Sequence, residues 1–440
     1  MPHCETLFPR GKKIGFIGLG RSNFPVAEML KNQGFDVTLR DKKPASPIDG
    51  YNCIFGENYL DGITEDVLFL APVIRPDVPQ IVKAKENGVY VTSEVNEYML
   101  RRKGKVIAVT GSDGKTTTTT LINEILKKSG IKTVLGGNIG YNLMVNLENE
   151  DEDTVTVCEL SSFQLMKLTA PPDVAVITNV SPNHLDWHRD MNEYIDAKKN
   201  IFRFMNHGRC VICGDDKTSM SFKDEIPVPY TVTSGTGFLK NGVCFNDEGI
   251  FVDGVKVLDD GDIILPGRHN RYNYCEAIAA TLGLAREGAA KEVAKEFPGV
   301  PHRIQFVREK DGVKYYNSSI DSSPTRTAAA LRSFRQKLIV ICGGYDKHIP
   351  LEPMAPLLEE KAKAVVLMGV TGAKIDVILK DASYSGIVEH ASSMKEAVEK
   401  ASFLAKDGDI VILSPAAASF DMFKNFEERG EIFVDCVNGL

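Results

Sequence analysis

The chain has 440 residues, which is too long for one ordinary hydrophobic core and predicts about two to four domains. Its composition, 43% hydrophobic and 25% charged, is typical of a globular protein, and no apolar run is long enough to cross a bilayer. Lys and Arg number 52 against 59 Asp and Glu, and the resulting net charge of −7 offers no broad positive surface for nucleic acid. Because the N-terminus lacks a secretory apolar segment, we expect a cytoplasmic protein without membrane insertion.

Nine cysteines are scattered along the chain, an odd number without paired spacing. The one C-x-x-C motif, Cys210 to Cys213, lies in an apolar run, and no second such pair completes a zinc ribbon. We interpret these cysteines as small apolar residues of a strand core, and they suit a reducing compartment.

Short β-like runs alternate with helical patterns, which predicts an α/β fold with largely parallel sheets. The first glycine-rich passage from strand to helix lies at residues 13–20 and leads into a helical pattern over residues 24–34. A second strand begins at residue 36 and ends at Asp41. The glycines, with Asp41 as a ribose ligand, could form a dinucleotide-binding fingerprint, but Asn23 replaces the third glycine.

The second glycine-rich passage predicts a site for the phosphates of ATP. A β-branched strand at residues 106–110 leads into a short loop, and a helix follows to about residue 129. Glycines let the backbone N–H groups of such a loop point at phosphate oxygens, the lysine adds a charge, and the Thr116 hydroxyl can bind Mg²⁺. Val109 stands where the general phosphate loop has its first glycine. The predicted ATP-binding residues of the loop are Gly111, Ser112, Asp113, Gly114, Lys115, Thr116 and Thr117.

Three further side chains could serve the phosphate loop. Glu159 ends the β-branched strand at residues 155–159, and a carboxylate at that end of a parallel strand is well placed to hold Mg²⁺. His184 follows the next strand, which favours a functional over a structural histidine. Lys198 lies in a helical stretch over residues 192–204, where a solvated lysine is the alternative interpretation.

A third glycine-rich passage follows the strand at residues 338–342 and contains Lys347. Before it, a long helix-like stretch occupies residues 272–297, and hydrophilic or proline-rich linkers occur near residues 101–105 and 298–301. These joints predict three domains: a Rossmann-like domain over residues 1–103, an ATP-binding domain with a mainly parallel sheet over 104–299, and a second Rossmann-like domain over 300–440.

Several segments together resemble the Mur ligases, and the loop by itself also resembles folylpolyglutamate synthases. The resemblance rests on G-x-x-G-K-T, E-L-S-S-F-Q-L, N-V-S-P-N-H-L-D and A-K-K-N-I-F, which lie at residues 111–116, 159–165, 179–186 and 197–202. It implies an ATP-dependent carboxylate–amine ligase with catalytic Lys115, Glu159, His184 and Lys198. In that family the lysine at the Lys198 position is carbamylated by CO₂, so the implied ligands of two Mg²⁺ ions are Thr116, Glu159, His184 and the Lys198 carbamate.

The same resemblance extends to substrate contacts outside the phosphate loop. Asn270, in an H-N-x-x-N segment, and Arg303, in a P-H-R linker, are implied to contact ATP. A UDP-linked precursor is implied to bind at Arg21, Ser22, Asp41, Lys42, Lys43 and Asn138.

The run at residues 413–430 resembles the branch of the family that adds D-glutamate. The implied D-glutamate contacts are Ser322, Lys347, Ser419 and Phe426. Two segments depart from the family pattern. Residues 317–322 read N-S-S-I-D-S where many relatives have N-D-S-K-A-T, and residues 71–75 read A-P-V-I-R where a Ser-Pro-Gly turn is expected.

The resemblance predicts a reaction in two stages. The carboxylate of UDP-N-acetylmuramoyl-L-alanine attacks the γ-phosphate of ATP, and D-glutamate then attacks the acyl phosphate. Such an enzyme would serve peptidoglycan synthesis and hence cell-wall biogenesis, cell shape and cell division, and we expect it to act as a monomer. The alternatives are a relative that adds another amino acid, and a non-catalytic homologue that binds the precursor. The non-catalytic relatives carry a four-cysteine zinc ribbon, which this sequence lacks.

Overall fold

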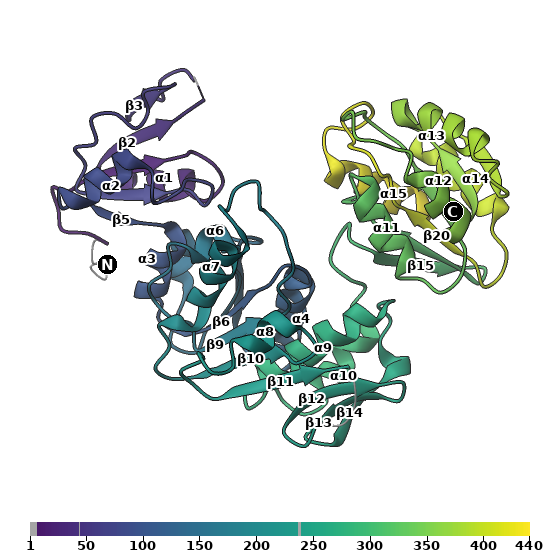
Figure 1. The fold of residues 1–440 in the computed structure, drawn as a ribbon, viewed down its shortest axis with the longest axis horizontal. Coiled ribbons are helices and arrows are strands. Elements are labelled where there is room, and N and C mark those ends of the chain that lie inside the picture. Colours follow the sequence, from purple (N-terminus) through teal and green to yellow (C-terminus); the bar gives the residue numbers. More distant parts are fainter. Residues whose placement is uncertain (1–6, 44, 236–238) are drawn as a thin grey trace. The chain divides into compact units, whose positions relative to one another are not determined.

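The computed structural model describes residues 7–43, 45–235 and 239–440, which form three β-sheets with flanking helices (Figure 1). The predicted α/β fold with mainly parallel sheets is confirmed. The chain divides into two compact units, residues 1–260 with 271–293, and residues 261–270 with 294–440. The first two sheets lie in the first unit and the third sheet in the second. Within the described ranges, no helix is long and apolar enough to span a membrane.

The first sheet has five parallel strands, of which β1 and β4 are central and buried. The strand order reverses between these two strands, and open α/β sheets bind ligands at the carboxyl ends of the strands at such a reversal. In sheet order the strands are β3 (Asn52–Phe55), β2 (Asp36–Asp41), β1 (Lys13–Ile17), β4 (Val67–Leu70) and β5 (Tyr90–Thr92), with helices α1 (Phe24–Asn32), α2 (Pro79–Glu86) and α3 (Glu94–Arg101).

The second sheet has nine strands, and its central strand β6 leads into the phosphate loop. Its order is β14 (Val255–Asp259), β13 (Gly249–Val252), β12 (Gly242–Asn246), β11 (Tyr230–Ser234), β10 (Arg209–Cys213), β9 (Val174–Ile177), β6 (Lys105–Thr110), β8 (Val155–Glu159) and β7 (Thr133–Gly137). Its helices are α4 (Lys115–Lys128), α5 (Leu143–Asn146), α6 (Ser162–Leu165), α7 (Met191–Arg203), α8 (Lys217–Ser221), α9 (Arg268–Thr281) and α10 (Ala289–Glu296), with short 3-10 turns η1 (Leu147–Asn149) and η2 (Asp260–Asp262).

The third sheet has six strands, of which only β15 runs antiparallel to its neighbour. Its order is β15 (Gln305–Lys310), β16 (Val313–Asn317), β20 (Ile410–Leu413), β17 (Leu338–Cys342), β18 (Ala362–Leu367) and β19 (Ile387–His390). The helices of this unit are α11 (Pro324–Arg332), α12 (Met354–Lys361), α13 (Gly369–Asp381), α14 (Met394–Leu404) and α15 (Phe426–Asn438).

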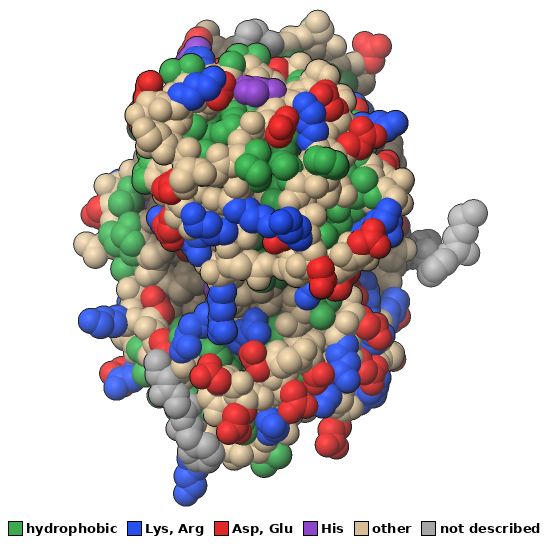
Figure 2. All heavy atoms as spheres, turned by 90° about the vertical axis from the view of Figure 1, so that its right-hand side faces the viewer, with side chains coloured by type: hydrophobic (Ala, Val, Ile, Leu, Met, Phe, Trp, Pro, Cys, Tyr) green, Lys and Arg blue, Asp and Glu red, His purple; other side chains and the backbone are tan. Residues whose placement is uncertain are grey.

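Apolar strand residues fill the cores of these sheets, since central parallel strands are covered on both faces. Cys210 and Cys213 lie buried in β10, as the apolar run predicts. Outside the cores, Figure 2 shows a face on which acidic and basic side chains are interspersed, in keeping with the modest net charge.

Two predictions about elements are wrong. The stretch at residues 272–297 is not one helix, because the chain turns after Thr281 and passes through Gly283 and Gly288, both at positive φ, before α10 begins. The glycine-rich passage after β17 was expected to lead from a strand into a helix. The next helix, α12, begins only at Met354, well after that passage. The antiparallel pairing of β12, β13 and β14 was not predicted.

Candidate active site

The phosphate loop, residues 110–117, joins β6 to α4 as the sequence predicts. Gly111 and Gly114 have φ of 153° and 80°, and a Cβ atom on Gly114 would lie 2.6 Å from Asn273 Oδ1. Both positions therefore require glycine. Lys115 is the first residue of α4, and its Nζ donates hydrogen bonds of 2.9 Å to the carbonyls of Gly111 and Ser112. The loop thus combines a helix N-terminus with a lysine over its backbone, an arrangement that binds phosphate.

The segment that carries His184 packs directly on this loop. We call residues 179–190 the His184 loop. Ser112 Oγ donates to Ser181 O at 2.8 Å and lies 2.9 Å from the Tyr194 hydroxyl, while Thr178 Oγ1 donates to Asp113 O at 2.6 Å. The phosphate loop is consequently tied to the end of β9, to the His184 loop and to α7.

The carboxylate of Glu159 faces the start of α4. Thr116 Oγ1 donates to Glu159 Oε2 at 2.7 Å, and Asn138 Nδ2 donates to Oε1 at 2.7 Å. Both oxygens retain lone pairs for a cation, and oxygen donors of this kind suit Mg²⁺. The structure thus places Asn138, predicted as a precursor contact, next to Glu159, one of the predicted metal ligands.

Lys198 reaches the phosphate loop from α7 and is buried, with only 1% of its surface exposed. Its Nζ donates to Gly111 O at 2.7 Å and lies 3.4 Å from Thr110 Oγ1. Burial lowers the pKa of Lys198 well below its usual value, and the charge of Lys115 lowers it further. A lysine with this environment is readily neutral, whereas the solvated lysine of the alternative interpretation would be exposed.

His184 is exposed on its loop and adopts a left-handed backbone conformation, with φ of 55°. Its ring lies 4.9 Å from that of Phe163, and burial, followed by the charge of Lys115, lowers the pKa of His184. Within the described ranges, no cluster of three or more His, Cys, Asp or Glu side chains could hold a metal. The predicted ligands do not form such a cluster because only Glu159 and His184 are of these residue types; the other two are Thr116 and Lys198.

Helix α9 packs against the first turn of α4, the helix that follows the phosphate loop. Thr118 Oγ1 donates to Glu276 Oε2 at 2.9 Å and to Asn273 Oδ1 at 3.2 Å, and burial raises the pKa of Glu276 to about 8. Asn270, predicted to contact ATP, stands in the first turn of the same helix, where its Nδ2 donates to Pro266 O at 2.6 Å.

The predicted precursor residues of the first sheet lie at the carboxyl ends of the neighbouring strands β1 and β2. Asp41 accepts the backbone N–H groups of Leu19 and Lys43 at 2.8 and 2.9 Å, so it joins the ends of β1 and β2. Buried Asn23 donates from Nδ2 to Gly18 O at 2.9 Å, which explains the residue at the third glycine position of the fingerprint. The exposed cations that follow these two strands are Arg21, Lys42 and Lys43.

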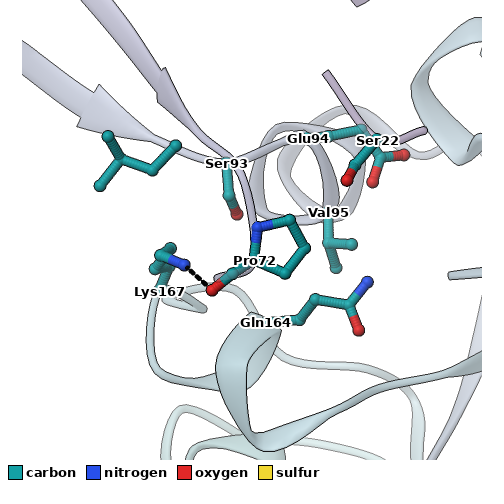
Figure 3. A pocket seen from close by; sticks show the side chains of 8 residues that line it. Ser22, Pro72, Ser93, Glu94, Val95, Gln164 and Lys167 are labelled. Carbon is teal, nitrogen blue, oxygen red and sulfur yellow. Dashed lines mark hydrogen bonds between the residues drawn. The ribbon is translucent and has the colours of Figure 1, made fainter. Parts of the chain in front are cut away.

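A pocket opens beside Ser22 and combines β4, the 71–77 loop and the start of α3 with Gln164 of α6 and with Lys167, just after α6 (Figure 3). Glu94 accepts the backbone N–H groups at the start of α5, and burial raises its pKa to about 7. Lys167 Nζ donates to Pro72 O at 2.7 Å, and burial lowers the pKa of Lys167 to about 7. The lining residues are Ser22, Leu70, Pro72, Ser93, Glu94, Val95, Gln164 and Lys167.

The four predicted amino-acid contacts lie in the second unit, three of them on loops at the carboxyl ends of neighbouring parallel strands. Ser322 follows β16, Ser419 follows β20, and Lys347 follows β17. A bridge between residues 345 and 418 joins the last two loops, so the strand order brings these segments together. Phe426 begins α15.

In the segment at residues 317–322, which departs from the family pattern, the structure shows a buried carboxyl. Asp321 is buried, accepts a hydrogen bond of 2.8 Å from Ser414 Oγ, and has its pKa raised by burial to about 6. The charge of Arg303 lowers the pKa of the same carboxyl. Arg303, a predicted ATP contact, therefore lies near Asp321.

Sequence reasoning missed the residues that hold these loops in place. Arg429 is buried and donates to the carbonyls of Ser319, Ala417 and Ala418 at 2.7 to 3.1 Å. Its only sequence signal is its place in the 413–430 run. Arg75 was seen as part of a departure. It pairs with the nearby Asp77, but its other partners, Trp187 and Glu193, lie more than 110 positions away and carried no signal.

The fold and the site together define an α/β protein with a phosphate loop and a neighbouring carboxylate, a class that binds nucleoside triphosphates. Residues 109–281 match the Mur ligase middle domain, and residues 302–417 match the Mur ligase glutamate ligase domain. The chain is 43% identical to the UDP-N-acetylmuramoylalanine--D-glutamate ligase of Clostridium botulinum, over 98% of both chains. It is 44% identical to that of Acetivibrio thermocellus, over 98% of this chain and 97% of the relative.

A solved structure shares the fold at lower identity. The UDP-N-acetylmuramate-alanine ligase of Thermotoga maritima superposes with a TM-score of 0.60 at 21% identity, covering 97% of this chain and 99% of that one. The chain belongs to the Mur ligase family, and within it to the UDP-N-acetylmuramoylalanine--D-glutamate ligases.

Proposed function

We propose that the protein catalyses the ATP-dependent ligation of D-glutamate to UDP-N-acetylmuramoyl-L-alanine, a step of peptidoglycan precursor synthesis. The observation that carries this proposal is the 43–44% identity to D-glutamate ligases over nearly the whole chain. An intact phosphate loop, with Glu159 and Lys198 beside it, supports an active enzyme over a non-catalytic homologue.

The chemistry requires a carboxylate to approach a phosphate, and the site can neutralise their repulsion. The loop amides and Lys115 hold the phosphates of ATP, and Lys115 stabilises charge that develops on the transferred group. Thr116 and Glu159 would hold a Mg²⁺ ion, which supplies further charge neutralisation. The precursor carboxylate displaces ADP to form an acyl phosphate, and the amine of D-glutamate then displaces phosphate to form the amide.

Lys198 is the proposed site of a carbamate. The neutral amine adds CO₂ and releases a proton, and the product is a carbamate anion that could hold a second Mg²⁺ with His184. The lowered pKa of Lys198 supports this step, because only the uncharged amine is nucleophilic. The family resemblance supplies the modification itself.

The remaining predicted contacts complete the proposal. The first unit would bind the UDP-precursor at the carboxyl ends of β1 and β2 and at the pocket of Figure 3, with Asn138 near the reacting carboxylate. The second unit would bind D-glutamate, with Lys347 pairing with a carboxylate. We further propose the domain boundaries at residues 103 and 299, a monomer and a cytoplasmic location. The proposed contacts are Arg21, Ser22, Asp41, Lys42, Lys43 and Asn138 for the precursor, Asn270 and Arg303 for ATP, and Ser322, Lys347, Ser419 and Phe426 for D-glutamate.

A phosphate-release assay tests the function directly. The purified chain is supplied with ATP, Mg²⁺ and UDP-N-acetylmuramoyl-L-alanine, together with D-glutamate, L-glutamate, L-alanine or a diamino acid. Phosphate release stimulated by D-glutamate alone, with the expected amide product detected by mass spectrometry, supports the proposal. Stimulation by a different amino acid would assign the chain to another branch of the family, and no stimulation by any would favour a non-catalytic role.

A further inference from the structure

Arg75 connects the first sheet to the segments that carry the metal-site residues. It lies in the 71–77 loop, which follows β4. Its Nη2 and Nη1 donate to Glu193 Oε1 and Oε2 at 2.8 and 3.1 Å, and Nη1 also donates to the carbonyl of Trp187 at 2.9 Å. Its guanidinium carbon lies 4.9 Å from the centre of the Trp187 ring. A planar guanidinium can make this paired contact and stack on an aromatic ring at once, whereas lysine cannot.

Other contacts hold the same loop against the same elements. Trp187 Nε1 donates to Val73 O at 3.0 Å, and Lys167, just after α6, donates to Ala71 O and Pro72 O at 3.0 and 2.7 Å. The side chains of Arg75 and Glu193 are only 21% and 14% exposed. An ion pair this sheltered and bidentate is stronger than the exposed pairs that contribute little to stability.

Glu193 lies where three elements of the site meet. It occupies the first turn of α7, the helix that carries Lys198, and its Oε2 accepts the backbone N–H of Arg189 in the His184 loop at 2.8 Å. The same oxygen lies 3.4 Å from buried His188 Nδ1, and His188 Nε2 lies 2.9 Å from the Ser162 hydroxyl. Ser162 begins α6 and stands three residues after Glu159. The Arg75–Glu193 pair therefore restrains the segments that hold His184, Lys198 and Glu159.

We propose that Arg75 is a positioning residue, through which the 71–77 loop of the first sheet fixes the His184 loop and the start of α7 in the geometry that binds Mg²⁺. Its kinetic consequences rest on the proposed function, whereas its structural consequence does not. Residues that orient metal ligands without touching the metal typically change metal affinity or activity by about 10- to 100-fold. The departure of residues 71–75 from the family turn thus has a role in this chain.

The only tryptophan of the chain, Trp187, reports on this contact without any turnover. In Arg75→Gln the indole loses its stacked guanidinium, and we expect red-shifted emission and stronger acrylamide quenching than in the parent chain. Arg189→Ala is the matched control. Arg189 also meets Asp77 and Glu193, but its side chain is 67% exposed and makes no ring contact with Trp187 among the described residues. The Arg189→Ala variant should therefore leave the emission spectrum of Trp187 unchanged.

Kinetics then test the effect on the metal site. We expect Arg75→Gln to require about 10- to 100-fold more Mg²⁺ for half-maximal phosphate release, with the KM for D-glutamate unchanged. Arg75→Lys keeps the charge but not the paired geometry and should restore activity only in part. Glu193→Gln should reproduce the Mg²⁺ phenotype, and the double variant should lose little more than either single variant because the two residues act as a pair.

The outcomes separate the two proposals. If Arg75→Gln melts like the parent chain and keeps both its Trp187 spectrum and its Mg²⁺ requirement, positioning by Arg75 is wrong. An equal effect of Arg189→Ala would also overturn it, because charge balance alone would then explain the result. If no amino acid stimulates the parent chain, the proposed function fails while the Trp187 spectra still decide whether Arg75 holds the loop. If Arg75→Gln unfolds, the same measurements on Arg75→Lys decide.

Discussion

The hydroxyl of Thr116 donates a 2.7 Å hydrogen bond to the carboxylate of Glu159, across the gap between the start of α4 and the end of β8. Asn138 donates to the other oxygen at the same distance. Both donors are neutral, so the negative charge of Glu159 remains available to a cation. The two side chains most suited to holding Mg²⁺ are thus already aligned with each other.

Replacing Glu159 by Gln should remove Mg²⁺-dependent turnover. The amide has no charge, and its NH₂ group would face a donor from Thr116 or from Asn138. We expect kcat for phosphate release to fall by about 100-fold or more, a loss comparable with removing an electrostatic group from an active site. Glu152→Gln is the control, since Glu152 is exposed just before β8 and should tolerate the change. Parent-like turnover in Glu159→Gln would contradict the assignment of Glu159.

The Lys198 carbamate predicts a specific chemical rescue. Lys198→Ala should lose activity, and short carboxylates such as formate or acetate should restore part of it by taking the place of the carbamate beside the phosphate loop. The neighbouring Lys199, which pairs with Glu225, provides the control, and Lys199→Ala should stay active without added carboxylate. Full activity in unsupplemented Lys198→Ala would refute the carbamate.

The sequence predicted the phosphate loop because its signal is local. A β-branched strand, two glycines and the Lys115–Thr116 pair stand in one short segment, and each has a role in the structure. Strands β8 and β17 have the predicted bounds, since both are short runs rich in β-branched or apolar residues and are buried on both faces. Position at a strand end was enough to bring Glu159 to this loop.

Interactions between residues that are far apart in the chain could not be predicted from the sequence. Arg75 and Glu193 are separated by 118 positions, and neither differs in pattern from a solvated charge. Glu94 begins α3, yet its carboxylate accepts the N–H groups at the start of α5, in another part of the sequence. The break between α9 and α10 was missed because the apolar periodicity continues through two glycines at positive φ.

A comparison of Gly114, in the phosphate loop, with Gly130, just after α4, can distinguish the effect of backbone strain from that of crowding. Their φ angles are 80° and 78°, but a Cβ on Gly114 would lie 2.6 Å from Asn273 Oδ1, whereas a Cβ on Gly130 meets nothing within 4 Å. Alanine at either position should cost about 1–2 kcal/mol of stability through the left-handed conformation. Only Gly114→Ala should also weaken ATP binding, because the loop must shift away from α9.

Calorimetric titration with an ATP analogue and Mg²⁺, run beside thermal melts, measures both effects. An equal loss of ATP affinity in the two variants would show that strain at positive φ, and not the contact with Asn273, controls the loop. Unchanged affinity in both would show that the loop adapts.

Glu276 predicts a pH-dependent loss of stability that one substitution should remove. Burial raises the pKa of Glu276 from 4.5 to about 8, so the folded chain holds this proton at pH values where the unfolded chain has released it. The resulting stabilisation is complete below the unfolded pKa of 4.5 and is lost as the pH rises through about 8. Glu276→Gln, which keeps a polar partner for Thr118, has no such proton.

The difference between the melting temperatures of Glu276→Gln and the parent chain isolates this effect from other titrations. It should move in favour of the variant between about pH 5 and 8, the window set by the two pKa values of Glu276. The nearby Cys213 thiol does not interfere, because burial raises its pKa to about 11. A difference that stays constant across this window would mean that Glu276 is ionised in the folded protein, and the support of the phosphate loop by a neutral carboxyl would have to be abandoned.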